Sequence, residues 1–579
     1  MAVASRAAIR GNFNPAAIIK GTRVTSAEQP AKGKPGGTFA ALREVTFRRI
    51  WISSLFSNFG QLILGVGAAW EMTRLSNSPG MVALVQSALM LPSMLVAVPA
   101  GALADMFDRR RIALAGLGFA ALSGLALSLL AYAGYTTPWM LLGFCVLIGA
   151  GVALYSPSWQ ASIGEQVSAE HLPAAVALGS ISYNVARSFG PALGGIIVLA
   201  WGAQAAFAIN AAAYLPLWVA FFFWSRRHVP SRLGPERIDR AIISGARYAF
   251  HSPQIRGVLL RAFLFGFCIA PLSALAPLIA KEQLHGNAQT YGLLLGAAGI
   301  GAVLGALQIT YLREKLGTEL AVRLFSVSTG VFMAVIGFSH SLPLVLFSMM
   351  ITGACSILSY SMLNVGVQLT APRWVTARAL SLYSSALTGG IAIGAGLWGA
   401  FMAHNGLQAT FVTAGAAVAA TTLIGLIAPL PVADGEGQGT VGLENDVAVA
   451  LDVNLRSGPV CIEVEYDVDP DLARDFYNAI RAVQKCRLRN GGFNWTVSRD
   501  IAAPNLWVER YHCPTWGEYL RMRTRYTHAD SDAQADANAF NRNSGELRVR
   551  RWLERPYGSV RLQADSPDLK LGTVNYIGP

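Results

Sequence analysis

The sequence predicts an all-α polytopic membrane protein with twelve transmembrane helices in two six-helix bundles, followed by a small α+β ferredoxin-like cytoplasmic domain. Three observations support this fold class. Charged residues make up only 14% of the 579 residues, whereas about a quarter is usual for a soluble protein. Apolar runs of about 20 residues recur from Trp51 to Leu430, and each is long enough to cross a bilayer. From Asp434 onward, charges are frequent and the pattern changes to short alternating segments and amphipathic helices.

The net charge of +13 is concentrated in the membrane part. Residues 1–430 hold 28 of the 46 Lys and Arg residues but only 12 of the 33 Asp and Glu residues, whereas residues 431–579 hold the remaining 18 and 21. A basic excess in the loops of a membrane protein fits contact with anionic lipid. We therefore expect a lipid bilayer as a partner and no nucleic acid.

The chain divides by composition into seven expected segments. These are a disordered basic cytoplasmic tail (1–46), an N-terminal six-helix bundle (47–225), a cytoplasmic central loop (226–255), a C-terminal six-helix bundle (256–430), a linker (431–456), a ferredoxin-like soluble domain (457–555) and a tail (556–579). The first segment lacks the apolar core of a secretory signal. The six cysteines show neither C-x-x-C nor Cys/His metal spacing, so we expect reduced cysteines, no metal site and no cofactor.

The twelve spans are counted from the apolar runs. They cover roughly 49–73, 80–104, 111–133, 138–160, 173–200, 203–225, 256–280, 289–312, 319–340, 343–365, 377–402 and 406–430. With this count nearly all loop arginines fall on one side of the membrane, and only Arg74 and Lys281 fall on the other. The positive-inside rule then places both termini in the cytoplasm, with the protein in the bacterial inner membrane.

The loop between the second and third spans carries an ordered series of glycine, aspartate and arginine. The series consists of Gly101, Asp105, Asp108, Arg109, Arg110 and Arg111. It resembles the signature loop of the major facilitator superfamily, and the resemblance implies a latch at the cytoplasmic side. Gly101 allows close helix approach, and Asp105 is expected to meet the N-terminus of a neighbouring helix. The alternative is an ordinary positive-inside loop, which would not need the aspartates.

The fifth span contains G-P-x-x-G-G, formed by Gly190, Pro191, Gly194 and Gly195. Proline bends a membrane helix, and glycines allow a partner backbone to approach closely. The stretch resembles the fifth-helix antiporter motif of exporters in the same superfamily. A kinked packing helix without directional meaning is the alternative.

Polar residues inside the spans are candidates for contact with substrate or coupling ion, because ionisable groups in a bilayer are costly and usually functional. Arg187 lies near the expected midplane and is expected to contact an anionic substrate group, with a structural partner as the alternative. Glu71 lies toward the outer end of the first span and is either a proton relay or an interfacial partner of Arg74. Arg261 is expected to reach the cytoplasmic surface. Asn58, Gln61 and Asn184 complete the set as residues that would line a central cavity.

The C-terminal segment predicts strands and helices in the order β-α-β-β-α-β, which is ferredoxin-like. The strands are expected at 461–466, 493–499, 506–512 and 547–553, and the helices at 470–489 and 516–526. The stretches 487–492 and 507–511 resemble small dimeric α/β-barrel domains related to antibiotic-biosynthesis monooxygenases, which follow some enterobactin-exporter-like, or transmembrane secretion effector, proteins. The resemblance implies a homodimer through this domain. His512, His528 and Glu509 form no recognisable catalytic set.

The leading functional hypothesis is a secondary transporter that exports a small amphipathic molecule, such as a siderophore, drug or metabolite, by alternating access, and is not an enzyme. No nucleotide-binding motif is present. A lysophospholipid flippase on the same fold is an alternative. A membrane-anchored monooxygenase-like enzyme and a sensor without transport are two further alternatives from other classes.

Overall fold

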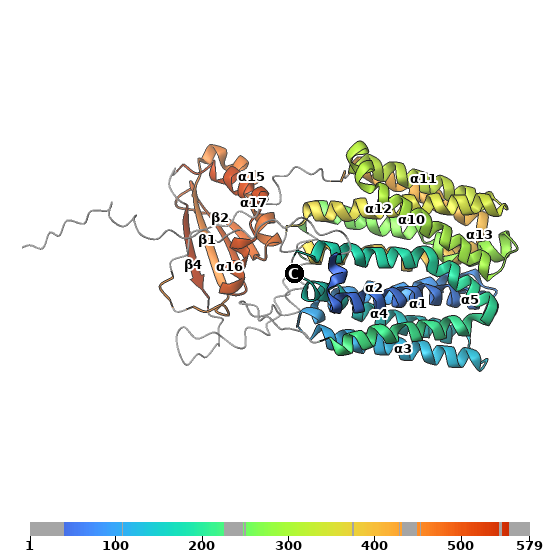
Figure 1. The fold of residues 1–579 in the computed structure, drawn as a ribbon. Coiled ribbons are helices and arrows are strands. Elements are labelled where there is room, and N and C mark those ends of the chain that lie inside the picture. The colour runs from blue at the N-terminus through green and yellow to red at the C-terminus, as the bar shows by residue number, and fades with distance from the viewer. Residues whose placement is uncertain are drawn as a thin grey trace, which may run out of the picture.

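The structure is a computed structural model that describes residues 40–106, 108–168, 170–224, 247, 251–372, 376–427, 429–430, 449–451, 453–542 and 547–554. Most of the N-terminal tail, the central loop and the linker lies outside the described residues, as does the tail after 555. The described residues form a long helical bundle and a smaller α+β domain beyond one end of it (Figure 1). The predictions for the outlying segments remain predictions.

The first half of the bundle contains five long helical segments among the described residues. They are α1 (Val45–Leu75), α2 (Pro79–Met106), α3 (Arg109–Tyr132), α4 (Pro138–Gln166) and α5 (Leu172–Phe223), preceded by the short helix η2 (Ala40–Arg43). The second half begins with four short pieces, α7 (Pro253–Ile269), α8 (Pro271–Ala274), α9 (Ala276–Leu278) and η3 (Ile279–Gln283). It continues with α10 (Ala288–Leu316), α11 (Thr318–Phe338), α12 (Leu342–Thr370), α13 (Thr376–Ala420), η4 (Thr421–Leu423) and α14 (Ile424–Ile427).

Among the described residues, ten helical segments are long and apolar enough to cross a membrane, and two of these contain a reversal. Helix α5 has 52 residues, or about 78 Å at 1.5 Å per residue, far more than one bilayer crossing needs. The helical conformation is interrupted at Gly202 in α5 and at Gly406 in α13, each with φ +79°. Glycine adopts this left-handed φ without steric cost. The predicted boundaries near 200–203 and 402–406 coincide with these breaks.

Packing shows that the chain turns back at both breaks. Before Gly202, α5 runs parallel to α1, since Gly190 faces Leu62 and Gly194 faces Val66. After it, α5 runs antiparallel to α1, because the residues of α1 at 60 and 67 face 213 and 206 respectively. In the second half, α7 runs parallel to the first part of α13, because residues 263 and 267 face 390 and 394 respectively. Helix α11 runs antiparallel to the second part of α13, because residues 330 and 337 face 415 and 411 respectively. Ten segments with two reversals make twelve crossings, which confirms the predicted fold class.

The two halves lie side by side (Figure 1) and meet along two antiparallel helix pairs. Helix α5 packs on α10, and α2 packs on α13, where the Ser87 hydroxyl donates to the Ala392 carbonyl at 2.6 Å. At the end of the bundle opposite the α2–α3 loop, Lys281 Nζ donates to the Thr73 carbonyl at 2.6 Å, and Trp70 stacks on Tyr291. Close contact between halves is therefore established at that opposite end.

The C-terminal domain is one antiparallel sheet with helices on one face. Its elements are β1 (Val460–Asp467), η5 (Pro470–Leu472), α15 (Ala473–Arg489), β2 (Phe493–Arg499), β3 (Leu506–Cys513), α16 (Trp516–Thr524), α17 (His528–Asn538) and β4 (Arg548–Leu553). The strand order is β2-β3-β1-β4, which is the ferredoxin-like arrangement. Alternate residues of β1, including Ile462 and Val464, pack with Phe476 and Ile480 of α15 in the core.

The sequence missed one helix of this domain, α17. The predicted single helix at 516–526 ends as α16 at Thr524, and a new helix begins after Thr527. Thr527 and Asp530 form a capping box, which satisfies backbone donors at the start of α17. The domain contacts the central segment through Arg247, whose guanidinium donates to the Gly491 carbonyl at 3.4 Å.

Candidate functional site

Four small residues of the fifth span place α5 between the two halves. Gly190 and Gly194 face α1, and a Cβ at Gly194 would lie 3.1 Å from the Val66 Cβ. Gly195 faces α10 instead, because a Cβ there would lie 2.5 Å from the Ala288 carbonyl oxygen. The Pro191 carbonyl in turn lies against Gly292 of α10. The predicted antiporter stretch therefore packs on both halves at once.

Arg187 lies one helical turn before this stretch, at the seam between the halves. A Cβ at Gly299 of α10 would lie 2.5 Å from the Arg187 carbonyl oxygen, so the backbones of α5 and α10 touch here. The Arg187 side chain is half-buried and lies in the neighbourhood of Tyr360 of α12. Within the part of the chain that the structure describes, the Arg187 guanidinium has no ion pair or hydrogen bond. The described residues therefore contain no structural partner for the Arg187 side chain, which was the alternative to contact with substrate.

Tyrosines from both halves surround this region. Tyr183, one turn before Arg187 on α5, lies in the neighbourhood of Tyr360 of α12. The Tyr383 hydroxyl of α13 donates to the Tyr360 carbonyl at 2.7 Å. Phenol groups and an arginine together offer hydrogen-bond donors, stacking faces and a positive charge. Such a set suits an aromatic or amphipathic molecule with an anionic group.

The three predicted amides occupy different places. Asn58 Nδ2 donates to the Ser182 hydroxyl at 3.1 Å and links α1 to α5. Asn184 Nδ2 donates to the Ser180 carbonyl of its own helix at 2.9 Å. Gln61 is half-buried on α1. The structure thus brings Asn58 near α5 but gives Asn184 a local partner, and the roles of all three in substrate contact remain predictions.

The first half also contains a group of buried polar side chains that the sequence analysis did not recognise as a group. The Ser57 hydroxyl, the Tyr214 hydroxyl and the whole Asn210 amide are buried without a well-formed hydrogen bond among the described residues. Buried polar groups normally have a hydrogen-bond partner in the protein or in an ordered water. Asn210 and Tyr214 are one turn apart on α5, and that spacing is the only signal in the sequence.

Glu71 is buried, yet its charge is already paired. Both of its carboxylate oxygens accept from Arg74 Nε, at 3.2 and 3.1 Å, and Arg74 lies three residues later on the same helix. This is the interfacial pair that the sequence offered as the alternative to a proton relay. It lies at the end opposite the α2–α3 loop.

At the α2–α3 loop, three residues of the signature act on three different elements. Asp108 caps α3 by accepting from the Arg110 backbone N–H at 2.9 Å. Arg109 forms an ion pair with Glu165 of α4 at 2.8 Å. Arg110 donates to the carbonyls of Phe221 and Phe222 at the end of α5, where unpaired carbonyls favour a cation. Gly101 and Asp105 lie in the last turns of α2, and the structure does not describe the surroundings of Gly101 or the side chain of Asp105.

The second half carries a related ion network, and here the expectation for Arg261 was wrong. Arg261 is only 3% exposed and forms two hydrogen bonds of 2.8 Å with Glu319 of α11, so it does not reach the surface. Arg323 also binds Glu319 and donates to the Gly425 carbonyl of α14. Arg323 therefore binds a carbonyl at the end of the last helix of the second half, as Arg110 does at the end of α5 in the first half. The acid lies 58 residues from Arg261, which is why the sequence did not reveal the pair.

We expect Glu319→Gln to lower the stability of the second half by about 3 kcal/mol, because it leaves the Arg261 charge buried without a counter-charge. Thermal unfolding of the purified protein, with hydrogen exchange of residues 253–269, measures the effect. Glu314→Gln, at an exposed position near the end of α10, is the matched control and should change stability little. Equal stability of the two variants would contradict this account of the network.

The C-terminal domain contains a buried ion pair beside a pocket of about 280 Å³. Glu509 is fully buried and accepts from Arg487 Nε at 3.0 Å, from Trp495 Nε1 at 2.9 Å and from the Tyr466 hydroxyl at 3.2 Å. Burial alone would lower the pKa of Arg487, but the Glu509 carboxylate raises it well above its usual value. Burial and the same carboxylate raise the pKa of Tyr466.

The three residues weighed for catalysis do not converge on this pocket. Glu509 forms an ion pair with Arg487, and His512 forms a hydrogen bond with Glu554. His528 is exposed at the start of α17. The pocket is lined instead by tyrosines, aliphatic side chains and three arginines, Arg487, Arg523 and Arg551. The described residues therefore offer no nucleophile with a base in this pocket.

Two six-helix halves, joined by glycine-lined helix pairs with an arginine at the seam, define the major facilitator class of membrane transporters. Residues 36–557 match the family model described as transmembrane secretion effector. Because the match covers most of the chain, the protein belongs to this family of major facilitator transporters. The family is not a class of enzymes, and membership implies a small-molecule substrate and a lipid environment.

Individual relatives are similar at low identity. The multidrug efflux pump Tap of Mycolicibacterium fortuitum is 24% identical over 378 residues, which are 63% of this chain and 90% of the pump. The enterobactin exporter EntS of Salmonella typhi is 26% identical over 379 residues, which are 61% of this chain and 84% of the exporter. Among solved structures, a POT family transporter superposes with a TM-score of 0.54 at 14% identity over 66% of this chain and 95% of its own. The nucleoside transporter NupG gives 0.52 at 13% identity over 66% and 98%. These structures support the fold.

Proposed function

We propose that the protein is a secondary exporter of a small amphipathic compound, of the kind represented by siderophores, drugs and metabolites, and that it works by alternating access. The names of two relatives, a multidrug efflux pump and an enterobactin exporter, support export as the direction. The packing of Gly190, Gly194 and Gly195 on both halves supports α5 as the helix along which the halves move against each other.

The observation that carries the proposal is Arg187 at the seam, whose guanidinium has no ion pair or hydrogen bond among the described residues. A cation in the membrane interior is costly unless it pairs with a counter-charge or faces a wet cavity. An anionic group of the substrate would supply the counter-charge between the halves, close to Tyr183 and Tyr360. Binding there would favour states in which the two halves are close, which is how a substrate controls a rocking transporter.

We further propose that the α2–α3 end faces the cytoplasm of a bacterial cell, with both termini on that side. Arg109 and Arg110 lie at this end, whereas Arg74 and Lys281 lie at the other. Arg74 is paired with Glu71, and Lys281 donates to the Thr73 carbonyl. The contacts from Lys281 to Thr73 and from Trp70 to Tyr291 support a conformation closed toward the outside.

We expect Arg187→Gln to reduce transport at least ten-fold, because the neutral amide cannot pair with an anionic group. A proton gradient is imposed across the membrane of reconstituted vesicles. The flux of enterobactin, an anionic catechol compound, is then compared with that of a cationic dye. Arg187→Lys keeps the charge and should retain more flux than Arg187→Gln. Arg313→Gln, at an exposed position on α10, serves as control. Gradient-independent flux that Arg187→Gln leaves unchanged would contradict the proposal.

A further inference from the structure

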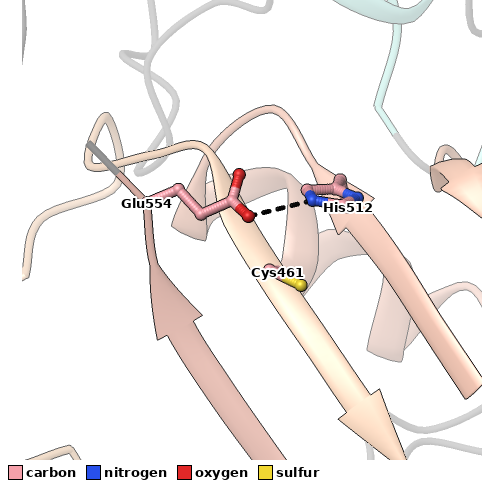
Figure 2. Close-up of side chains that lie close together, drawn as sticks. All are labelled: Cys461, His512 and Glu554. Atoms are coloured by element: carbon pink, nitrogen blue, oxygen red, sulfur yellow. Dashed lines mark hydrogen bonds and ion pairs between the residues drawn. The ribbon is translucent and has the colours of Figure 1, made fainter. Parts of the chain in front are cut away.

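Three potential metal ligands meet on the sheet of the C-terminal domain. They are the Cys461 thiol of β1, the His512 imidazole of β3 and the Glu554 carboxylate just after β4 (Figure 2). One ligand atom from each lies within 4.8 Å of the others, and His512 Nε2 is 3.1 Å from a Glu554 oxygen. The sequence did not reveal this group because its members are 42 and 51 residues or more apart and share no metal-binding spacing.

The strand register explains why they meet. Strand β1 lies between β3 and β4, and Cys461 is directly opposite His512 in the β1–β3 pairing. Cys461 also pairs with Trp552 of β4, and Glu554 continues that edge, since its N–H donates to the Pro459 carbonyl at 2.9 Å. Side chains alternate along a strand. Because Val460 and Ile462 face the helices, Cys461 projects from the opposite, helix-free face.

We propose that Cys461, His512 and Glu554 form a binding site for one Zn²⁺ ion. A thiolate, an imidazole and a carboxylate are the donors that zinc uses. In a tetrahedral zinc site the donor atoms are about 3.3–3.7 Å apart, so the side chains need to move by only about 1 Å. Three protein ligands leave a fourth position for water.

Two features of the surroundings support a ligand at this place. Cys461 is only 3% exposed, and the Nδ1 atom of His512 is buried without a hydrogen-bond partner among the described residues. The two ring nitrogens exchange on a half-turn of the ring, so either nitrogen is available to an ion. Arg510, on the same face, forms its ion pair with Glu463 and not with Glu554.

The test is zinc binding by the purified full-length protein after removal of metal with a chelator. We expect one Zn²⁺ per chain by competition with a chromophoric chelator. Co²⁺ in its place should give the near-ultraviolet absorption of a thiolate–cobalt bond. Cys461→Ser, His512→Gln and Glu554→Gln should each weaken binding at least ten-fold, and Cys461→Ser should abolish the cobalt–thiolate band.

His528→Gln removes an exposed histidine of the same domain and is the matched control, which should bind as the wild type does. Glu554 is 44% exposed at its side chain, so Glu554→Gln should fold normally even if Cys461→Ser does not. Added Zn²⁺ should also raise the unfolding temperature of the wild type but not of Glu554→Gln. Absence of stoichiometric binding, or binding that all three substitutions leave unchanged, would overturn the proposal.

Discussion

Gly195→Leu is expected to reduce transport more than ten-fold in reconstituted vesicles. A Cβ at this position would lie 2.5 Å from the Ala288 carbonyl oxygen and 3.1 Å from the Gly292 Cα. Both are backbone atoms of α10, so no flexible side chain can move aside. The two helices must separate, and overpacking of this kind costs about 1–3 kcal/mol or more. A cost of about 3 kcal/mol lowers the population of the state closed at this end more than a hundred-fold.

Gly179→Leu is the matched control for that experiment. Gly179 lies on the same helix, and no heavy atom lies within 4 Å of a Cβ built there. Cross-linking between cysteines introduced at positions 73 and 281 reports the closed state directly, because these residues are in contact in the structure. Efficient cross-linking together with normal transport in Gly195→Leu would show that this interface tolerates bulk and would refute the packing argument.

Glu509→Ala is expected to destabilise the C-terminal domain by about 3–5 kcal/mol, which is a large share of the stability of a domain of this size. The substitution leaves the Arg487 charge buried and removes the acceptor for Trp495 and Tyr466 at the same time. Hydrogen exchange of residues 493–513 in the full-length protein should rise, and the unfolding temperature of this domain should fall.

An exposed ion pair of the same domain provides the comparison. Asp469 pairs with Arg542, and both side chains are more than a third exposed. Asp469→Ala should therefore change stability far less than Glu509→Ala does. If both substitutions had the same small effect, the Arg487–Glu509 pair would not contribute in the way its burial indicates.

The positions of the membrane-spanning helices were predictable because hydrophobicity is a local property of the chain. The apolar runs located the reversals at Gly202 and Gly406 to within a few residues. Contacts between distant segments were not predictable in this way. Arg110 meets Phe221 across 111 residues, and no period in the sequence connects them.

In the C-terminal domain too, local patterns were predictable from the sequence and contacts between distant segments were not. Alternation predicted the strands, since a half-buried strand has a period of two. Helix α17 was missed because its segment, 528–538, is rich in alanine and aspartate and has only a weak apolar face, so its start depends on the Thr527 cap. The Cys461, His512 and Glu554 group depends on strand register, which a single sequence does not specify.

The network around Glu319 also holds the last described residues of the helical bundle against α11. Glu319 accepts from the Leu430 N–H at 2.9 Å, and Arg323 holds the Gly425 carbonyl just before it. Strand β1 begins about thirty residues later, at Val460. Among the described residues, the end of the helical bundle at Leu430 is thus bound to α11 of the second half. If the two halves rock against each other as proposed, this fixed end of the helical bundle moves with the second half.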